Sequence, residues 1–114
     1  MSDERIRRTV EELSRLLASA DYREIETLTS GTRLSSEEIA GVIAEYGRTV
    51  IIPPTEAYDY LDTIEVAGAA TRTWSVTMPL WTAEEGRSDL SMELTLLELF
   101  DGTLRVELDN LHVA

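Results

Sequence analysis

Cysteine and lysine are both absent from this sequence, and each absence removes a class of chemistry. Without cysteine there is no disulfide, no thiolate nucleophile and no cysteine-bound zinc. Without lysine there is no Schiff-base catalysis and no P-loop lysine to hold a phosphate. His112 is the single imidazole, so any histidine-based acid–base step has to use it. What remains for catalysis is chiefly carboxylates and tyrosines.

Positive charge is also scarce. The chain has ten arginines and 22 acidic residues, which give a net charge of -12. Such a charge repels nucleic-acid phosphate and anionic lipid, so we expect neither nucleic-acid nor membrane binding. The imbalance is uneven: residues 1–48 hold seven arginines and ten acids, and residues 49–114 hold three arginines and twelve acids. The second half would attract a basic protein partner, although the same charge also serves solubility alone.

Long hydrophobic runs are missing as well. No stretch approaches the length of a membrane span, and the charged start Met1–Arg5 leads into no apolar segment of the kind that a secretory signal needs. We therefore expect a cytoplasmic protein. A chain of 114 residues is long enough for one hydrophobic core and too short for two, so we expect a single domain over residues 1–114. We predict no cofactor.

Apolar residues recur at helical spacing in the first part of the chain. A helix over about residues 3–19 is predicted by one apolar stripe. The stripe consists of Ile6, Val10, Leu13 and Leu17. Asp21 and Ser35 are predicted N-caps of a short second helix and of a third helix that ends at Gly47.

After Gly47 the apolar residues alternate, which predicts β-strands. The predicted strands cover about residues 50–52, 63–67, 73–80, 89–100 and the stretch from 103 onward. Pro79 cannot donate a ladder hydrogen bond, so we expect it at a sheet edge or at a bulge. The predicted fold is α+β, with three N-terminal helices packed on a strongly bent antiparallel sheet of four or five strands.

The register of the last hairpin can also be predicted. Asp101-Gly102 indicates a two-residue turn, because both positions favour positive φ. This turn pairs Leu97 with Val106 on the inner face. Since Leu94 has the opposite parity, we expect a β-bulge between Leu94 and Leu97, and a further parity change after Leu108.

Two stretches resemble known families. Ala-Ser-Ala-Asp-Tyr-Arg-Glu-Ile-Glu-Thr-Leu at 18–28, between helices and ahead of long hairpins, resembles the nuclear-transport-factor-two-like (cystatin-like cone) superfamily. That resemblance implies a cone with a pocket, whose catalytic members hold an Asp–His or Tyr–Asp pair, but no motif here matches such a pair. Pro-Leu-Trp-Thr-Ala-Glu-Glu-Gly-Arg-Ser-Asp-Leu at 79–90, with Leu-Asp-Asn-Leu-His-Val at 108–113, resembles a small bacterial domain family of unknown function. This second resemblance covers most of the chain and implies no activity.

An acidic and aromatic segment follows Pro53-Pro54, and we take it as a candidate binding site. Its candidate residues are Glu56, Tyr58, Asp59 and Tyr60. Tyrosine is a low-entropy anchor, so the segment predicts a landing site for a basic protein, or alternatively a connection whose tyrosines cap the core. Trp81 is predicted on the face opposite Trp74, either as a second interface residue or as part of a small cluster beneath the following loop.

The loop after Trp81 gathers three further candidate binding carboxylates, which are Glu84, Glu85 and Asp89. Hard oxygen ligands of this kind bind calcium or magnesium, but their spacing is not that of an EF-hand. We therefore favour a solvated loop and predict no metal.

Two functions remain open from the sequence. The first is a non-enzymatic acidic binding domain that docks a basic protein partner, as an immunity-like or regulatory module. The second is a cone-type pocket protein that binds a small ligand, or acts as a weak isomerase or hydrolase. In that case His112, with Asp109 or Tyr58 nearby, would act as the acid or base, and Trp74 would line the pocket. We favour the first, because no paired-carboxylate motif stands out. A homodimer is compatible with both.

Overall fold

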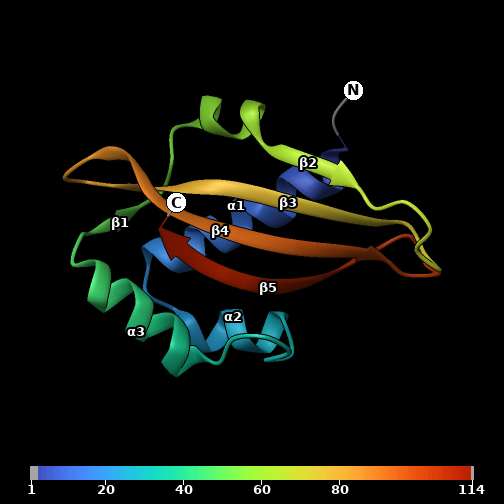
Figure 1. The fold of residues 1–114 in the computed structure, drawn as a ribbon, viewed down its shortest axis with the longest axis horizontal. Coiled ribbons are helices and arrows are strands. Elements are labelled where there is room, and N and C mark those ends of the chain that lie inside the picture. The colour runs from blue at the N-terminus through green and yellow to red at the C-terminus, as the bar shows by residue number, and fades with distance from the viewer. Residues whose placement is uncertain (1–2, 114) are drawn as a thin grey trace.

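The computed structural model describes residues 3–113, with three helices ahead of a five-stranded antiparallel sheet that does not close (Figure 1). The helices are α1 (Glu4–Ala18), α2 (Tyr22–Leu28) and α3 (Ser36–Tyr46). The later elements are β1 (Val50–Ile51), the 3₁₀-helix η1 (Thr55–Tyr60), β2 (Asp62–Glu65), β3 (Thr73–Thr82), β4 (Gly86–Glu98) and β5 (Leu104–Val113). The predicted α+β class is confirmed.

The helix ends follow local signals in the sequence. Asp3 caps α1, and Ser35 caps α3 in a full capping box with Glu38. Gly47 ends α3 in the left-handed conformation, with φ at 74°, which glycine adopts without steric cost. None of the helices within residues 3–113 is long and apolar enough to cross a bilayer.

Strand β3 is the centre of the sheet. One side pairs with β4, and the other pairs with two short strands, β1 opposite residues 81–82 and β2 opposite residues 74–77. Pro79 lies between these two short strands, and the pairing of β3 with β4 shifts register just after it. A residue without an N–H is tolerated at such a gap and bulge, so the predicted environment of Pro79 is confirmed.

The turn between β4 and β5 is one residue longer than predicted. The backbone N–H of Leu99 donates to the Thr103 carbonyl at 2.8 Å, which closes a three-residue loop rather than the two-residue Asp101-Gly102 turn. Gly102 adopts φ of 86°, as the last residue of such a loop commonly does. The Asp-Gly signal therefore located the turn correctly but gave the wrong loop length.

One extra loop residue reverses the facing of every β4 side chain relative to β5. Leu96 is opposite Val106 and fully buried, whereas Leu97 lies half-buried on the other face. The bulge predicted just before Leu97 is therefore wrong, because β4 keeps one continuous inner row. The parity change predicted after Leu108 is confirmed, with Asp109 as the extra residue of a bulge in β5.

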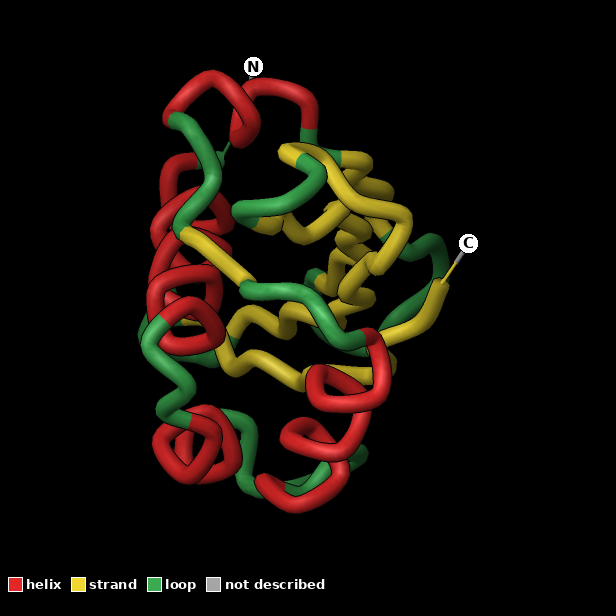
Figure 2. The backbone as a smooth tube through the Cα atoms, turned by 90° about the vertical axis from the view of Figure 1, so that its left-hand side faces the viewer, coloured by secondary structure: helices red, strands yellow, loops and turns green. Residues whose placement is uncertain are grey.

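The core lies between the sheet and the helices, which gather on one side of it (Figure 2). The inner rows of the two long strands are Trp74, Val76, Met78 and Leu80 on β3, and Leu90, Met92, Leu94 and Leu96 on β4. The α1 stripe packs against this core. Within residues 3–113 no helix covers the opposite face of the sheet, which we call the open face (Figure 1).

Candidate functional site

A cavity of about 350 Å³ lies beneath η1 and β2, between the start of α1 and strand β3. Its lining combines apolar side chains with charged groups of both signs: Asp3, Ile6, Arg7, Tyr58, Asp59, Leu61, Thr63, Glu65, Arg72 and Trp74. The volume falls in the range of small-molecule sites. We therefore take this cavity as a candidate binding site.

Strand β2 separates this cavity from the open face. Thr63 and Glu65 pair with core-facing residues of β3 and line the cavity. Asp62 and Ile64 alternate with them and pair with Thr77 and Ser75 on the open face. The same short segment therefore serves two surfaces, one on each side of the strand.

Two arginines form the charged walls of the cavity. Arg7 donates to Asp59 at 2.7 Å and to the Thr55 carbonyl at 3.1 Å, and its guanidinium lies 5.6 Å from the centre of the Tyr58 ring. Arg72 bonds Glu65 through two nitrogens and lies 4.8 Å from the Trp74 ring. Each wall thus pairs a cation with an acid and an aromatic ring.

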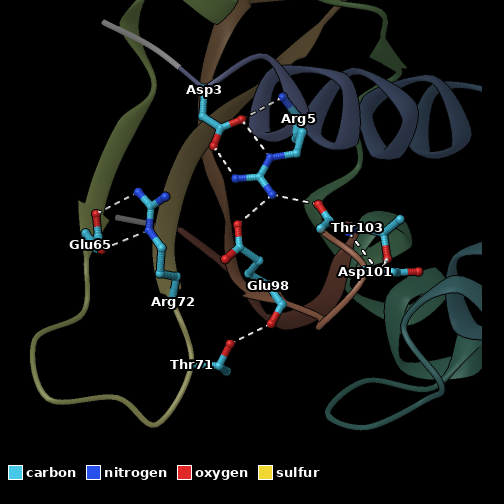
Figure 3. A network of polar contacts seen from close by, with 9 residues as sticks. Asp3, Arg5, Glu65, Thr71, Arg72, Glu98, Asp101 and Thr103 are labelled. Carbon is cyan, nitrogen blue, oxygen red and sulfur yellow. Dashed lines mark hydrogen bonds and ion pairs between the residues drawn. The ribbon is translucent and has the colours of Figure 1, made fainter.

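Arg5 lies near the Arg72–Glu65 pair and connects the start of α1 to the β4–β5 hairpin (Figure 3). Its guanidinium bonds Asp3 at 2.7 Å, Glu98 at 2.7 Å and the Gly102 carbonyl at 2.6 Å. The side-chain hydrogen bonds from Arg5 are the main cause that lowers the pKa of Asp3 below its usual range. The start of α1 is therefore fastened to the β4–β5 turn.

The predicted acidic and aromatic segment divides into inward and outward residues. Tyr58 is buried, and burial raises the pKa of its hydroxyl, while Asp59 is paired with Arg7. Tyr60 is 84% exposed, and Glu56 forms no ion pair within residues 3–113. The structure therefore leaves Glu56 and Tyr60 exposed at the surface and places Tyr58 and Asp59 at the cavity.

The predicted acidic loop is tied to its own chain. Both Glu84 oxygens accept from Thr49, at 2.8 and 2.9 Å, and the backbone N–H of Thr49 is the leading cause that lowers the pKa of Glu84. Glu85 accepts from the Tyr46 hydroxyl at 2.8 Å. Asp89 is exposed, and Trp81 is half-buried on the open face beside Ile51.

The proposed catalytic trio is not brought together. His112 lies 3.8 Å from Glu93, near α3 and in a shallow depression that is separate from the cavity. Asp109 accepts from Thr95 at the β5 bulge, whereas Tyr58 lines the cavity under η1. Tyr58 and His112 therefore lie at separate sites, and no hydrogen bond joins Asp109 to His112 in the described part of the chain, residues 3–113. Within residues 3–113 no three metal-ligating side chains cluster.

The sequence interpretation missed the arginines that build the cavity. Arg7 and Arg72 lie in an amphipathic helix and in a loop, where charge is ordinarily a sign of solvent exposure. The one available signal was the run 49–71, which holds four acids and no arginine and is flanked by Arg48 and Arg72. A segment of that kind needs cations from elsewhere in the fold, and α1 supplies Arg7 to it.

A comparison with family models assigns this chain to a family. A model described as "Domain of unknown function (DUF7668)" matches residues 14–114. The chain belongs to this family. No curated protein and no solved structure matches it. The matched region contains the whole sheet but only the last part of α1. The α1 side of the cavity, formed by Asp3, Ile6 and Arg7, therefore lies outside it.

Proposed function

We propose that this family member is a non-enzymatic docking domain for a basic protein partner, in the manner of an immunity or regulatory module acting in the cytoplasm. The observation that carries the proposal is the run 49–71, which has four carboxylates, no cation of its own and several exposed apolar side chains. Arg7 and Arg72 pair with Asp59 and Glu65, which leaves Glu56 and Asp62 without an ion pair within residues 3–113. Those exposed residues are Ile51, Ile52, Tyr60, Ile64 and Val66. A surface that is both apolar and acidic suits a partner of the opposite charge.

The docking surface consists of the open face along its β1–β2 edge. Ile51 is paired with Trp81 there, and Ile64 and Asp62 follow on β2 along the same side of β3. Ile64 is 60% exposed, and Asp62 forms no ion pair within residues 3–113. Apolar anchors beside unpaired carboxylates supply both contact area and attraction at a distance.

The test uses a photo-crosslinking residue at position 60 to capture the partner, followed by affinity measurements on the purified pair. We expect the double substitution Asp62→Lys with Ile64→Asp to abolish binding. The control is Glu24→Lys with Glu37→Lys, which reverses two exposed carboxylates on α2 and α3 and so makes a larger change in net charge away from the open face. This control should bind like the wild-type chain apart from a modest loss of association rate.

Salt dependence completes the test. Association with a basic partner should slow steeply as ionic strength rises, because screening removes the long-range attraction. An affinity that is the same at low and high salt contradicts the proposal. So does a partner that is lost with the α2–α3 control variant and retained by the open-face variant.

A further inference from the structure

The cavity beneath η1 retains hydrogen-bonding capacity that its own ion pairs do not use. Arg72 bonds Glu65 through Nε and Nη2, which leaves Nη1 without a partner among residues 3–113. Asp59 accepts from Arg7 through Oδ1 and keeps Oδ2 free of hydrogen bonds in the same part of the chain. Thr63, which carries a hydroxyl, also lines the cavity. A donor and an acceptor of opposite charge therefore border one space.

We propose that this cavity binds a small zwitterion, with one carboxylate and one ammonium group on an apolar body, as in an apolar α-amino acid. Arg72 and the Thr63 hydroxyl receive the carboxylate, and the free oxygen of Asp59 receives the ammonium group. The apolar body lies against Ile6 and the Trp74 indole, both of which line the cavity.

The charge of the lining favours a zwitterion over a simple ion. Three carboxylates, on Asp3, Asp59 and Glu65, share the cavity with the guanidinium groups of Arg7 and Arg72. A simple anion meets the carboxylates and a simple cation meets the arginines, so each is partly repelled. A molecule that carries both charges can match both. The Arg72–Glu65 pair is half exposed, with both bonds at 3.3 Å, so adjusting it to admit a ligand costs little.

This site is independent of the docking proposal. Docking uses Asp62 and Ile64, which point to the open face, whereas the cavity uses Thr63 and Glu65 on the other side of β2. Either proposal can fail without the other.

The experiment uses the fluorescence of the full chain carrying Trp81→Phe. This substitution leaves Trp74, in the cavity wall, as the single tryptophan. Titration with L-leucine, L-methionine and L-phenylalanine should give a saturable change in Trp74 emission for at least one of them. For an L-leucine response, isopentylamine lacks the carboxylate and 4-methylpentanoate lacks the ammonium group, and each should bind at least about tenfold more weakly.

Variants locate the site. Arg72→Gln and Thr63→Val should each weaken binding of the amino acid, by about tenfold for the arginine, whose hydrogen bond is charge-assisted. Arg105→Gln changes an exposed arginine on the open face and is the matched control, with affinity unchanged. Thermal unfolding of each variant checks that it is folded.

Three outcomes overturn the inference. They are the absence of saturable binding by all three amino acids, equal binding of a singly charged analogue, and a folded Arg72→Gln variant that binds like the wild-type chain.

Discussion

At the scale of single residues, Arg5 shows how far a side chain can reach beyond its own helix. It lies in the first turn of α1, yet its guanidinium bonds Glu98 and the Gly102 carbonyl, 93 and 97 positions away. The short-range pairs of α1 follow helical spacing, as in Glu4 with Arg8 at 3.8 Å. No periodic pattern connects Arg5 to the last hairpin, because that contact exists only once the sheet has formed.

The ion pair between Asp3 and Arg5 makes the stability of the protein depend on pH. The pKa of Asp3 is lowered in the folded chain, so its ion pair adds stability above the ordinary aspartate pKa of about 4, and this stability is lost as pH falls through the lower folded value. Asp3→Asn keeps a good N-cap but removes the charge. We expect the wild-type chain to be more stable than the variant at pH 7, by about 1 kcal/mol or less.

The measurement is urea unfolding of both proteins from pH 7 down to pH 2. The difference in unfolding free energy should shrink steadily below about pH 4 as the wild-type carboxylate is protonated. A difference that stays constant over this range contradicts the role of the Asp3 charge.

At the scale of elements, local signals define the helices well. The capping box at Ser35 predicts the start of α3, and Ser35→Ala should destabilise the protein by about 1 kcal/mol because the Glu38 N–H loses its acceptor. Ser36→Ala, at the next position, is the matched control and should change stability by less than about 0.5 kcal/mol. Chemical denaturation of the two variants compares them directly, and equal losses would exclude the cap.

The β4–β5 register makes a second prediction at this scale. Leu96 is fully buried and Leu97 is half-buried on the open face. Leu96→Ala should therefore cost about 2–5 kcal/mol, and Leu97→Ala about 1 kcal/mol or less. Equilibrium unfolding measures both. The two-residue turn that the sequence suggested predicts the reverse order, so this pair of variants decides between the two registers.

The register shows where sequence reasoning stops. Asp101-Gly102 marks a turn because Gly102 accepts positive φ, but this preference is the same in a two-residue and a three-residue loop. Alternation within β4 is ambiguous near the turn, since Leu94, Leu96 and Leu97 are all apolar. Burial of Leu96 in the common core distinguishes the two registers, and that burial is a property of the whole fold. The cavity was missed for the same reason, because its walls come from four separate elements.

At the scale of the whole molecule, the first helix is part of the core. Ile6, Val10 and Leu13 precede the family-matched region and are at most 4% exposed. Burying three such side chains contributes about 1.5–3 kcal/mol each, which together approaches the whole stability of a typical domain. We expect a chain that begins at Ser14 to lose cooperative thermal unfolding by circular dichroism. A chain that begins at Asp3 is the control, and cooperative unfolding of the shorter chain contradicts this account.

The hydrogen bonds from Arg5 to Glu98 and to the Gly102 carbonyl also have a consequence for biosynthesis. A ribosome releases α1 first, while Glu98 and Gly102 are still untranslated, so Arg5 cannot bond to them until the β4–β5 hairpin has been made. The hydrophobic core is likewise incomplete until β4 and β5 have emerged, because Leu94, Leu96 and Leu108 belong to it. Folding of this domain is accordingly completed only after the β4–β5 hairpin has been synthesised, and contacts between segments far apart in the sequence slow it.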